Sequence, residues 1–508
     1  MLACALRLPG LASRSLWVDE AWRANVALAS SWSGFWNDVL GSGRIEAPMP
    51  PLYALALRLI GMVVGHSAGG LRASSLAASV AAIPLAYVLG RHARGPVAGI
   101  AAAMAFACYP AAVTYGRELK PYAFDVLVVL AVLVCAARTI ARRDRASWIL
   151  LAAMTALAPG LSYPAILVLP GVALGLLATC RDRRDFRRWL ATEVFATLSL
   201  LVWYVLVIAV QRQRPGVVAY WGGAFPSFTA SGATAVLAAG TELIEFAAGT
   251  PAWLFALAVA LGFFSTPRWL RLATLGTVTT VVVVGFLRMY PLSGGRTSLF
   301  LLPFIYVALA VAAAALIPAA RGEARAASHG RRVATVSRVL AAMAAVVVLA
   351  LPLRGASHPD AGLVYEETAP LISWLTAERK PDDRVYVYYA AGPAFLFYHP
   401  EVDPGVTMGG LHRGDAGAYE AEVRPLLAPS TRIWILFAHV FTPRDGASER
   451  DTILDAVRLC GRQLEARETV GASLHLFEVI RAANQVRHIQ IRPEDAANPD
   501  RLRELLGK

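Results

Sequence analysis

The segment YGRELKPYAFDVLVVLAVLVCAARTIARRDR, residues 115–145, joins a charged turn, an apolar run and a cluster of arginines. The apolar run, about 122–140, has the length of roughly 20 residues that a helix needs to cross a bilayer. Short loops rich in arginine and lysine stay on the cytoplasmic side of a membrane. The segment therefore predicts a membrane-spanning helix with its arginine end inside the cell and its charged turn outside.

The composition of the whole chain agrees with this prediction. The 508 residues are 57% hydrophobic and 16% charged, with a mean hydropathy of +0.52, whereas soluble domains carry about 25% charged residues. The net charge of +13 comes mostly from short loops between apolar runs, which disfavours nucleic acid as a partner. These loops contain Arg91 and Arg94; Arg138, Arg142, Arg143 and Arg145; Arg181, Arg183, Arg184, Arg187 and Arg188; Arg268 and Arg271; and Arg321, Arg325, Arg331, Arg332 and Arg338.

Apolar runs of similar length recur along the first 354 residues, which we predict to be one transmembrane domain. The candidate spans are about 70–90, 96–114, 122–140, 147–163, 164–180, 189–210, 250–266, 272–290, 298–318 and 338–354. The sides of the membrane alternate consistently if one further helix precedes residue 13, which gives about eleven spans. Residues 1–13 are too short to span and contain Arg7 and Pro9.

With the arginine loops inside, the remaining connections lie outside the cytoplasm. They are the first outer loop, 13–69; the turns 115–121, 162–164 and 291–297; the stretch 211–249; and everything after about 355. Residues 51–65 are apolar but short and contain Arg58, so we predict an interfacial or re-entrant helix there. The predicted location is the inner (plasma) membrane, with the active site and the C-terminal domain extracytoplasmic.

Residues 355–481 have a different pattern, which predicts a small extracytoplasmic α/β domain. The segments 385–389, 432–437 and 474–480 read as strands, and 369–380 and 451–468 read as amphipathic helices. Residues 482–508 form a charged tail. The five cysteines have no spacing that indicates zinc or a disulfide framework. We assign no metal site and no certain cofactor, and the dependence on a divalent metal is left open.

Three polar groups fall on the outer side, each beside an apolar helix. The first is Asp19-Glu20 in SLWVDEAW, 15–22. The second is YGRELKPYAFD, 115–125, with Arg117, Glu118, Lys120, Tyr122 and Asp125. The third is YPLSGGRTSLFLLP, 290–303, with Gly294, Gly295 and Arg296. Charge at membrane depth is costly and by default indicates function. The alternative is that these are ordinary polar residues at helix ends.

These residue types suit transfer from a phosphate-linked donor at the membrane surface. A leaving phosphate needs positioned cations, for which Lys120 and Arg296 are candidates. The glycine pair would let backbone approach a ligand, and Asp19 or Glu20 could take the proton of an acceptor hydroxyl. The histidines of the C-terminal domain, His399, His412 and His439, have no ligand spacing and read as surface or core residues.

Five ordered segments resemble one known family. They are SLW-x-DEA; APMPPLY, 47–53; ELKPYAFD; YPLSGGRTSLFLLP; and VYVYYAAGPAFLFY, 385–398. Together they are similar to bacterial glycosyltransferases of the GT-C fold, in the family 39-like group related to dolichyl-phosphate-mannose–protein mannosyltransferases and the lipid A aminoarabinose transferase. The resemblance covers most of residues 13–400.

The resemblance implies a transferase that takes a sugar from a polyprenyl-phosphate donor outside the cytoplasm, commonly with inversion at the anomeric carbon. By this resemblance Asp19 matches a catalytic base, Glu118 a second acid, and Lys120 and Arg296 ligands of the lipid phosphate. Glu20 is expected to support Asp19. Arg117, Tyr122, Tyr53 and Gly295 complete the predicted substrate-binding set. Met49 stands where related sequences often have His or Lys.

Two other classes of protein stay open at this point. A transporter or flippase of a lipid-linked glycan would need polar groups within its spans, and runs such as 278–287 are uninterrupted. A non-catalytic membrane scaffold would use the outer domain to bind a partner. The sugar and the acceptor, whether glycan, lipid or protein, cannot be read from the residues.

Overall fold

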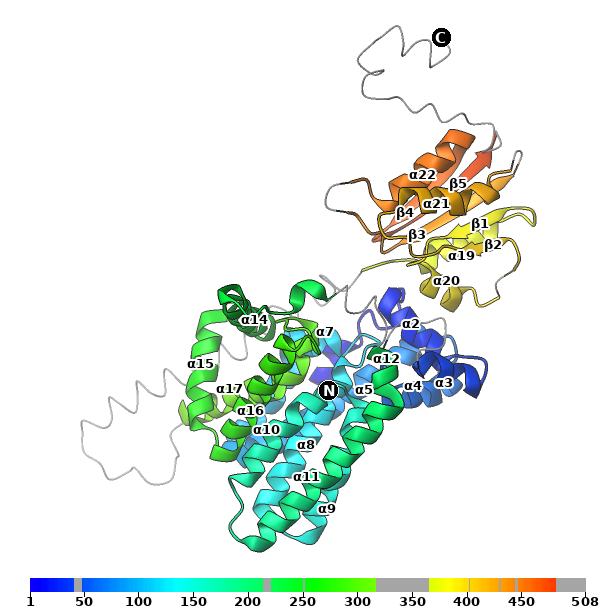
Figure 1. Ribbon diagram of the computed structural model, residues 1–508. Helices are drawn as coiled ribbons and strands as arrows, with labels where there is room; N and C mark the ends of the chain where they lie inside the picture. Colours follow the sequence, from blue (N-terminus) through cyan, green and yellow to red (C-terminus); the bar gives the residue numbers. More distant parts are fainter. Residues whose placement is uncertain are drawn as a thin grey trace. The chain divides into compact units, whose positions relative to one another are not determined.

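A computed structural model describes residues 1–40, 48–212, 221–249, 252–316 and 365–480 except 402, 429–430 and 444–445 (Figure 1). It forms two compact units. The first contains Met1–Arg14 and the chain from Trp22 onward, and the second contains Ser15–Ala21 together with the C-terminal region. The predicted span at 338–354 and the tail 482–508 lie outside the described residues. The domain boundaries expected from the sequence stay predictions.

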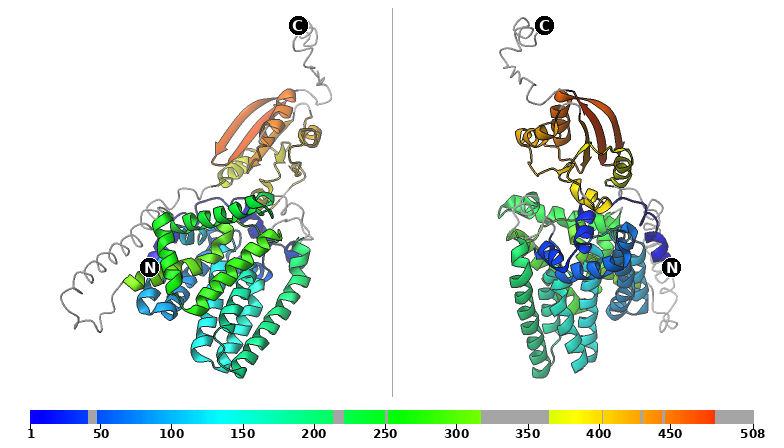
Figure 2. Two further views of the ribbon diagram at one scale, coloured as in Figure 1. Left: turned by 60° about the vertical axis from the view of Figure 1, so that its left-hand side comes forward. Right: turned by 90° about the vertical axis from the view of Figure 1, so that its right-hand side faces the viewer.

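The first unit is built of helices. Their bounds are α1 Leu2–Arg7, α2 Val18–Ala27 (within which the division of units falls), α3 Trp32–Leu40, α4 Pro51–Val64, α5 Ala68–Arg94, α6 Pro96–Cys108, α7 Pro110–Tyr115, α8 Tyr122–Arg142, α9 Arg145–Leu161, α10 Ala165–Leu177, α11 Arg183–Trp203, η1 Tyr204–Ile208, α12 Ala209–Arg212, η2 Gly222–Ala224, α14 Ala230–Ala248, α15 Ala252–Ser265, α16 Arg268–Phe286, η3 Arg296–Leu301 and α17 Leu302–Leu316. Figure 2 shows α8, α9 and α11, coloured cyan to green, running side by side.

Small residues set the closest helix contacts of this unit. A Cβ atom at Gly171 of α10 would lie 2.2 Å from the Ala273 carbonyl oxygen of α16. A Cβ atom at Gly90 of α5 would lie 2.5 Å from the Ala98 carbonyl oxygen of α6. Only glycine allows such approach, which is how helices pack where lipid tails compete for apolar side chains.

Five helical segments among the described residues are long and apolar enough to cross a membrane. They are α5, α8, Arg183–Arg212, α16 and Arg296–Ala315. Four shorter apolar helices, α4, α6, α9 and α10, accompany them. The predicted fold class, a helical membrane protein with a small C-terminal α/β domain, is confirmed. The number of eleven spans stays a prediction.

Two helical features differ from the sequence-based expectation. The expected span at 96–114 breaks at Tyr109, which is extended, and Pro110 begins α7. Proline has no N–H to continue the hydrogen bonding of α6, so the chain restarts a helix there. The stretch 211–249, expected as an outer connection, contains the 19-residue helix α14.

The second unit contains a five-stranded sheet of order β2-β1-β3-β5-β4. Strands β1 and β2 are parallel, β1 and β3 are parallel, and β5 is antiparallel to β3 and β4. The bounds are α19 Ala369–Glu378, β1 Arg384–Val387, α20 Gly392–Tyr398, β2 Val406–Met408, α21 Ala416–Val423, η4 Arg424–Leu426, β3 Arg432–Ala438, α22 Glu449–Cys460, β4 Gly461–Thr469 and β5 Ala472–Val479.

Helices cover both faces of this sheet, which explains why the central strand β3 is apolar along its length. Trp374 of α19 packs against Trp434 of β3 on one face. On the other face, Arg450 of α22 pairs with Glu468 of β4. The strands predicted at 385–389, 432–437 and 474–480 and the helix predicted at 369–380 correspond to β1, β3, β5 and α19.

The helix predicted at 451–468 is wrong beyond its first half. Helix α22 ends at Cys460, and β4 follows directly as Gly461–Thr469. Strand β4 is an edge strand that is exposed along most of its length, so it carries polar residues on both faces and lacks an alternating pattern. Its Arg, Gln, Glu, Leu and Ala residues also favour helix intrinsically.

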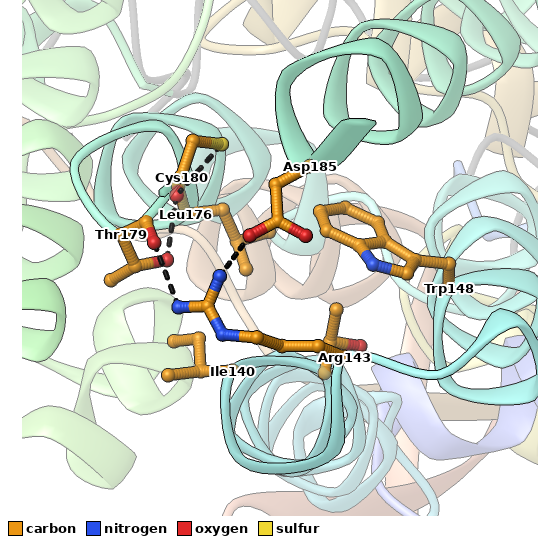
Figure 3. Close-up of a pocket in the computed structure, with 8 residues that line it drawn as sticks. Ile140, Arg143, Trp148, Leu176, Thr179, Cys180 and Asp185 are labelled. Carbon is orange, nitrogen blue, oxygen red and sulfur yellow. Dashed lines mark hydrogen bonds and ion pairs between the residues drawn. The ribbon is translucent and has the colours of Figure 1, made fainter. Parts of the chain in front are cut away.

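At the arginine-rich end of the helices, Arg143 joins two loops (Figure 3). It ends α8 in the left-handed region, with φ of 55°. Its guanidinium pairs with Asp185 of α11 and donates a 2.8 Å hydrogen bond to the Thr179 carbonyl. The cavity beside it measures about 10 Å³, room for about one water molecule. Arg143 therefore holds the loop after α8 to the loop after α10.

We expect Arg143→Ala to lower the thermal unfolding midpoint of the detergent-purified chain. The substitution leaves the buried Asp185 carboxylate without its ion partner, at a cost of about 1–3 kcal/mol. Arg142→Ala is the matched control, because Arg142 is the neighbouring arginine and is exposed. The double variant Arg143→Ala, Asp185→Ala should lose less than the sum of the two single changes. An equal loss in Arg142→Ala would contradict this role.

Candidate active site

The turn between α7 and α8 buries its charged residues. Arg117 and Glu118 have no exposed surface, and Lys120 is 3% exposed. The turn lies directly on α5: a Cβ atom at Gly116 would be 2.5 Å from Ser79 Oγ, and Ser75 Oγ donates a 3.4 Å hydrogen bond to the Lys120 carbonyl. Burial of charge costs free energy unless opposite charges or hydrogen bonds compensate it, so this turn has the character of a built site.

Arg117 is engaged with backbone. Its guanidinium donates a hydrogen bond to the Pro9 carbonyl, and its own carbonyl accepts a 3.2 Å hydrogen bond from Arg14. These contacts tie the turn to the first residues of the chain. The predicted contact between Arg117 and a substrate stays a prediction.

Lys120 lies beside an aromatic ring. Its Nζ is 5.6 Å from the centre of the Tyr122 ring, within the range of a cation–π interaction. Tyr115 packs edge-on against the same ring at 5.4 Å. Of the 48 basic residues in the chain only three are lysines. Lysine is therefore a rare choice in this chain. Its compact ammonium has a different shape from the larger, planar guanidinium of arginine, so the two side chains would not bind a ligand here in the same way.

The first turn of α8 adds a carboxylate to this group. Asp125 is buried and interacts with Ser162 and with the charge of Arg23. Tyr290 lies close enough to Asp125 to interact with the charge of its carboxylate. Tyr53 of α4 is fully buried, with its ring 5.1 Å from that of Phe124. Tyr53 therefore lies close to the start of α8, where Lys120 and Tyr122 are also found.

The loop 290–301 contributes Arg296. Arg296 begins η3 and is half-buried, and η3 packs against α8. The two glycines before it differ. A Cβ atom at Gly294 would lie 2.2 Å from Glu242 Cβ of α14, whereas the nearest atom to one at Gly295 is Ser293 Oγ at 3.6 Å. Gly294 is required for the approach to α14, and Gly295 is the position with space beside it.

The segment with the two outer acids belongs to the second unit. Ser15 Oγ donates a 2.7 Å hydrogen bond to Glu367 and accepts one of 3.0 Å from the Ala369 amide. The Leu16 amide donates to Tyr398 Oη at 2.8 Å. These contacts hold the start of α2, and with it Asp19 and Glu20, to the α/β domain. Asp19 is half-buried and Glu20 is fully buried.

His439 and Glu366 were not recognised as functional candidates in the sequence. His439 Nδ1 lies 2.6 Å from Glu366 Oε1, and the Val18 amide donates a 3.0 Å hydrogen bond to Glu366 Oε2. The hydrogen bond to Glu366, together with the nearby Asp19 carboxylate, raises the pKa of His439 above its usual value of 6.5. No local pattern could reveal these contacts, because their partners are 73 and 348 positions apart in the sequence.

Within the described ranges, no three or more His, Cys, Asp or Glu side chains are arranged to hold a metal ion. The first unit offers buried cations with a carboxylate and tyrosines, suited to a phosphate and the group attached to it. The second unit offers Asp19 beside an imidazole, suited to accepting a proton.

The fold is that of GT-C glycosyltransferases. The chain is similar in structure to ArnT from Cupriavidus metallidurans in the apo state, with 14% sequence identity and a TM-score of 0.58. It is also similar to the same protein bound to undecaprenyl phosphate, with 15% identity and a TM-score of 0.60. Each match covers 93% of this chain and 96% of the other.

A sequence comparison gives the same relation for part of the chain. Residues 48–210 match the model of the family described as dolichyl-phosphate-mannose-protein mannosyltransferase. No curated protein matches the chain. The predicted resemblance to GT-C enzymes of the mannosyltransferase and aminoarabinose transferase groups is confirmed at the level of the fold.

We expect Gly294→Ala to destabilise the protein and Gly295→Ala to leave its stability unchanged. The added methyl group at 294 meets the backbone of α14, and overpacking of this kind costs about 1–3 kcal/mol. The measurement is the thermal unfolding midpoint of both variants in the same detergent. Equal midpoints for the two variants would contradict the packing role of Gly294.

Proposed function

We propose that this protein is a membrane glycosyltransferase. It moves a sugar from a polyprenyl-phosphate-linked donor to an acceptor hydroxyl on the extracytoplasmic side, with inversion at the anomeric carbon. The observation that carries the proposal is the buried Arg117-Glu118-Leu119-Lys120 turn, found in a chain with the fold of ArnT. A structure of that protein contains undecaprenyl phosphate.

The cations of the first unit would bind the lipid phosphate. Lys120 is almost fully buried, and a cation in a dry site stabilises developing negative charge far better than one in water. Arg296 can present two parallel N–H groups to phosphate oxygens. The backbone at Gly295 has room for a ligand to approach. Arg117 would contribute its positive charge from within the turn.

The acids would act at the sugar and at the acceptor. Asp19 takes the proton of the acceptor hydroxyl while the acceptor oxygen forms a bond to the anomeric carbon. The bond from that carbon to the phosphate oxygen breaks in the same step, and the phosphate leaves with the electron pair. A single displacement of this kind inverts the anomeric centre. Glu118 would bind hydroxyl groups of the donor or acceptor, and Glu20 would support Asp19.

The tyrosines complete the proposed substrate-binding set. Tyr122 lies beside Lys120, where its ring can hold the ammonium toward a phosphate. Tyr53 of α4 is buried against Phe124 in the first turn of α8, and aromatic faces suit the apolar face of a sugar or the first isoprene unit of the lipid. The membrane supplies the lipid, and the acceptor is a glycan, a lipid or a protein.

Lipid binding can be measured without knowing the sugar. Undecaprenyl phosphate should raise the thermal unfolding midpoint of the purified protein, because a ligand at about 100 times its Kd adds about 2.7 kcal/mol of stability. Undecaprenol, which lacks the phosphate, should not. Lys120→Ala should abolish the shift, and Lys380→Ala should keep it because Lys380 is an exposed lysine of the α/β domain. An undiminished shift in Lys120→Ala would contradict the assignment of that residue.

Transfer can be measured by mass spectrometry of the lipids and glycans of cells with and without the protein. Asp19→Asn should accumulate the lipid-linked sugar and lose the glycosylated product, with normal expression and a normal shift with undecaprenyl phosphate. Asp382→Asn is the matched control, since Asp382 is an exposed aspartate. Unchanged product in Asp19→Asn would overturn the base assignment. Movement of lipid across vesicles without a covalent product would favour a flippase instead.

A further inference from the structure

The residue that follows β3 has an unusual backbone. His439 has φ of +50°, a conformation that side chains with a Cβ atom adopt at a cost and that persists where the surroundings enforce it. Its position is the carboxyl end of β3, beside the carboxyl end of the parallel strand β1. In sheets of this kind, the loops after the carboxyl ends of parallel strands are where functional residues gather. The strained backbone at His439 therefore suggests that this residue has a role other than packing.

Glu366 connects His439 to the start of α2. Glu366 is 3% exposed, and its two oxygens face different partners: the His439 imidazole at 2.6 Å and the Val18 amide at 3.0 Å. A buried carboxylate is stable when a cation and N–H donors compensate it. The Val18 amide belongs to the first turn of α2, where amide groups have no partner within the helix. Glu366 thus fixes the imidazole and the helix start against each other.

Asp19 directly follows Val18 and interacts electrostatically with the imidazole. The charged groups that face His439 are Glu366 from the segment before α19, Asp19 from α2, and Arg413 from the loop after β2. The two carboxylates favour the imidazolium, and Arg413 opposes it. The imidazole is half-exposed. Because Nδ1 is bound to Glu366, the N–H on Nε2 is the one that can serve a second acceptor.

We propose that His439, held by Glu366, is a positioning residue for Asp19. Its imidazolium orients the Asp19 carboxylate and keeps it ionised, ready to accept the proton of the acceptor hydroxyl. Histidine suits this task because two neighbouring acids favour its charged form, while it can still lose its proton as the pH rises. This inference rests on the proposed function for its consequence in catalysis, but the coupling between His439 and Asp19 can be measured by itself.

The first experiment measures the coupling without any activity. Hydrogen–deuterium exchange at histidine C2, read by mass spectrometry on the full chain in detergent, gives the pKa of single histidines. We expect the pKa of His439 to lie above 6.5 and to fall in both Glu366→Gln and Asp19→Asn. His399 is the internal control and should not change in either variant. An unchanged pKa of His439 in Asp19→Asn would overturn the inference, whatever the protein catalyses.

The second experiment measures transfer against pH in the wild type and in His439→Asn. Asparagine tolerates the left-handed region, so this variant removes the imidazole and keeps the backbone. We expect a loss of about tenfold or more at neutral pH, mainly in kcat, and unchanged stabilisation by undecaprenyl phosphate. His399→Asn should behave as the wild type.

The pH profile separates positioning from a merely structural role. The imidazolium is the active form, so wild-type transfer should fall as the pH rises through the raised pKa of His439, and His439→Asn should lack that limb. Identical profiles in an active wild type and in His439→Asn would overturn the inference. A wild type without transfer would overturn the proposed function, and the histidine titration would still decide the coupling.

Discussion

Carbonyl groups that have no hydrogen-bond partner within a helix or a regular segment need donors from elsewhere. In this protein, buried arginines donate those hydrogen bonds. Arg7 has no exposed surface and donates to the carbonyls of Phe106 and Ala107, where α6 ends. Arg72 of α5 donates to the carbonyl groups of residues 11 and 14, Arg58 of α4 donates to those of 27 and 29, and Arg117 donates to that of residue 9. A guanidinium has five donors and no acceptor, so one side chain can satisfy several carbonyls of an irregular segment. These contacts hold the irregular backbone around residues 9–14 and 27–29 in place.

The same constraint explains why the sequence predicted the fold well and the first loop poorly. The thickness of the bilayer sets the length of apolar runs, and arginine-rich loops mark the cytoplasmic ends of those runs. Segments such as 122–140 and 272–290 could therefore be recognised as helices. Arg7 was taken as evidence against a membrane span near the start, and Arg58 as an interruption of an apolar run. Both are fixed by contacts with distant or irregular backbone, and no local pattern records such contacts.

The candidate site divides in the same way. Lys120 and Arg296 could be named as candidates because each stands in a charged or glycine-rich turn between apolar runs, where a polar residue needs a reason. His439 and Glu366 could not be recognised as candidates in this way. His439 follows an ordinary buried strand, and its partner lies 73 positions away, in a segment whose own link to α2 crosses 348 positions. Only the fold of the second unit brings them to the helix that carries Asp19.

The burial of the two outer acids distinguishes their roles. A general base has to be reached by the proton that it accepts. Asp19 is half-buried and interacts electrostatically with the imidazole of His439, whereas Glu20 has no exposed surface. A neighbouring imidazolium favours the ionised carboxylate, because opposite charges at short range stabilise each other. Accessibility and charge thus select the same residue. Glu20 is fully buried next to it, and in the proposed mechanism it would support the local charge balance. The adjacent carboxylates are therefore not equivalent, and Asp19, which is the more accessible and interacts electrostatically with His439, is the one that we propose as the base.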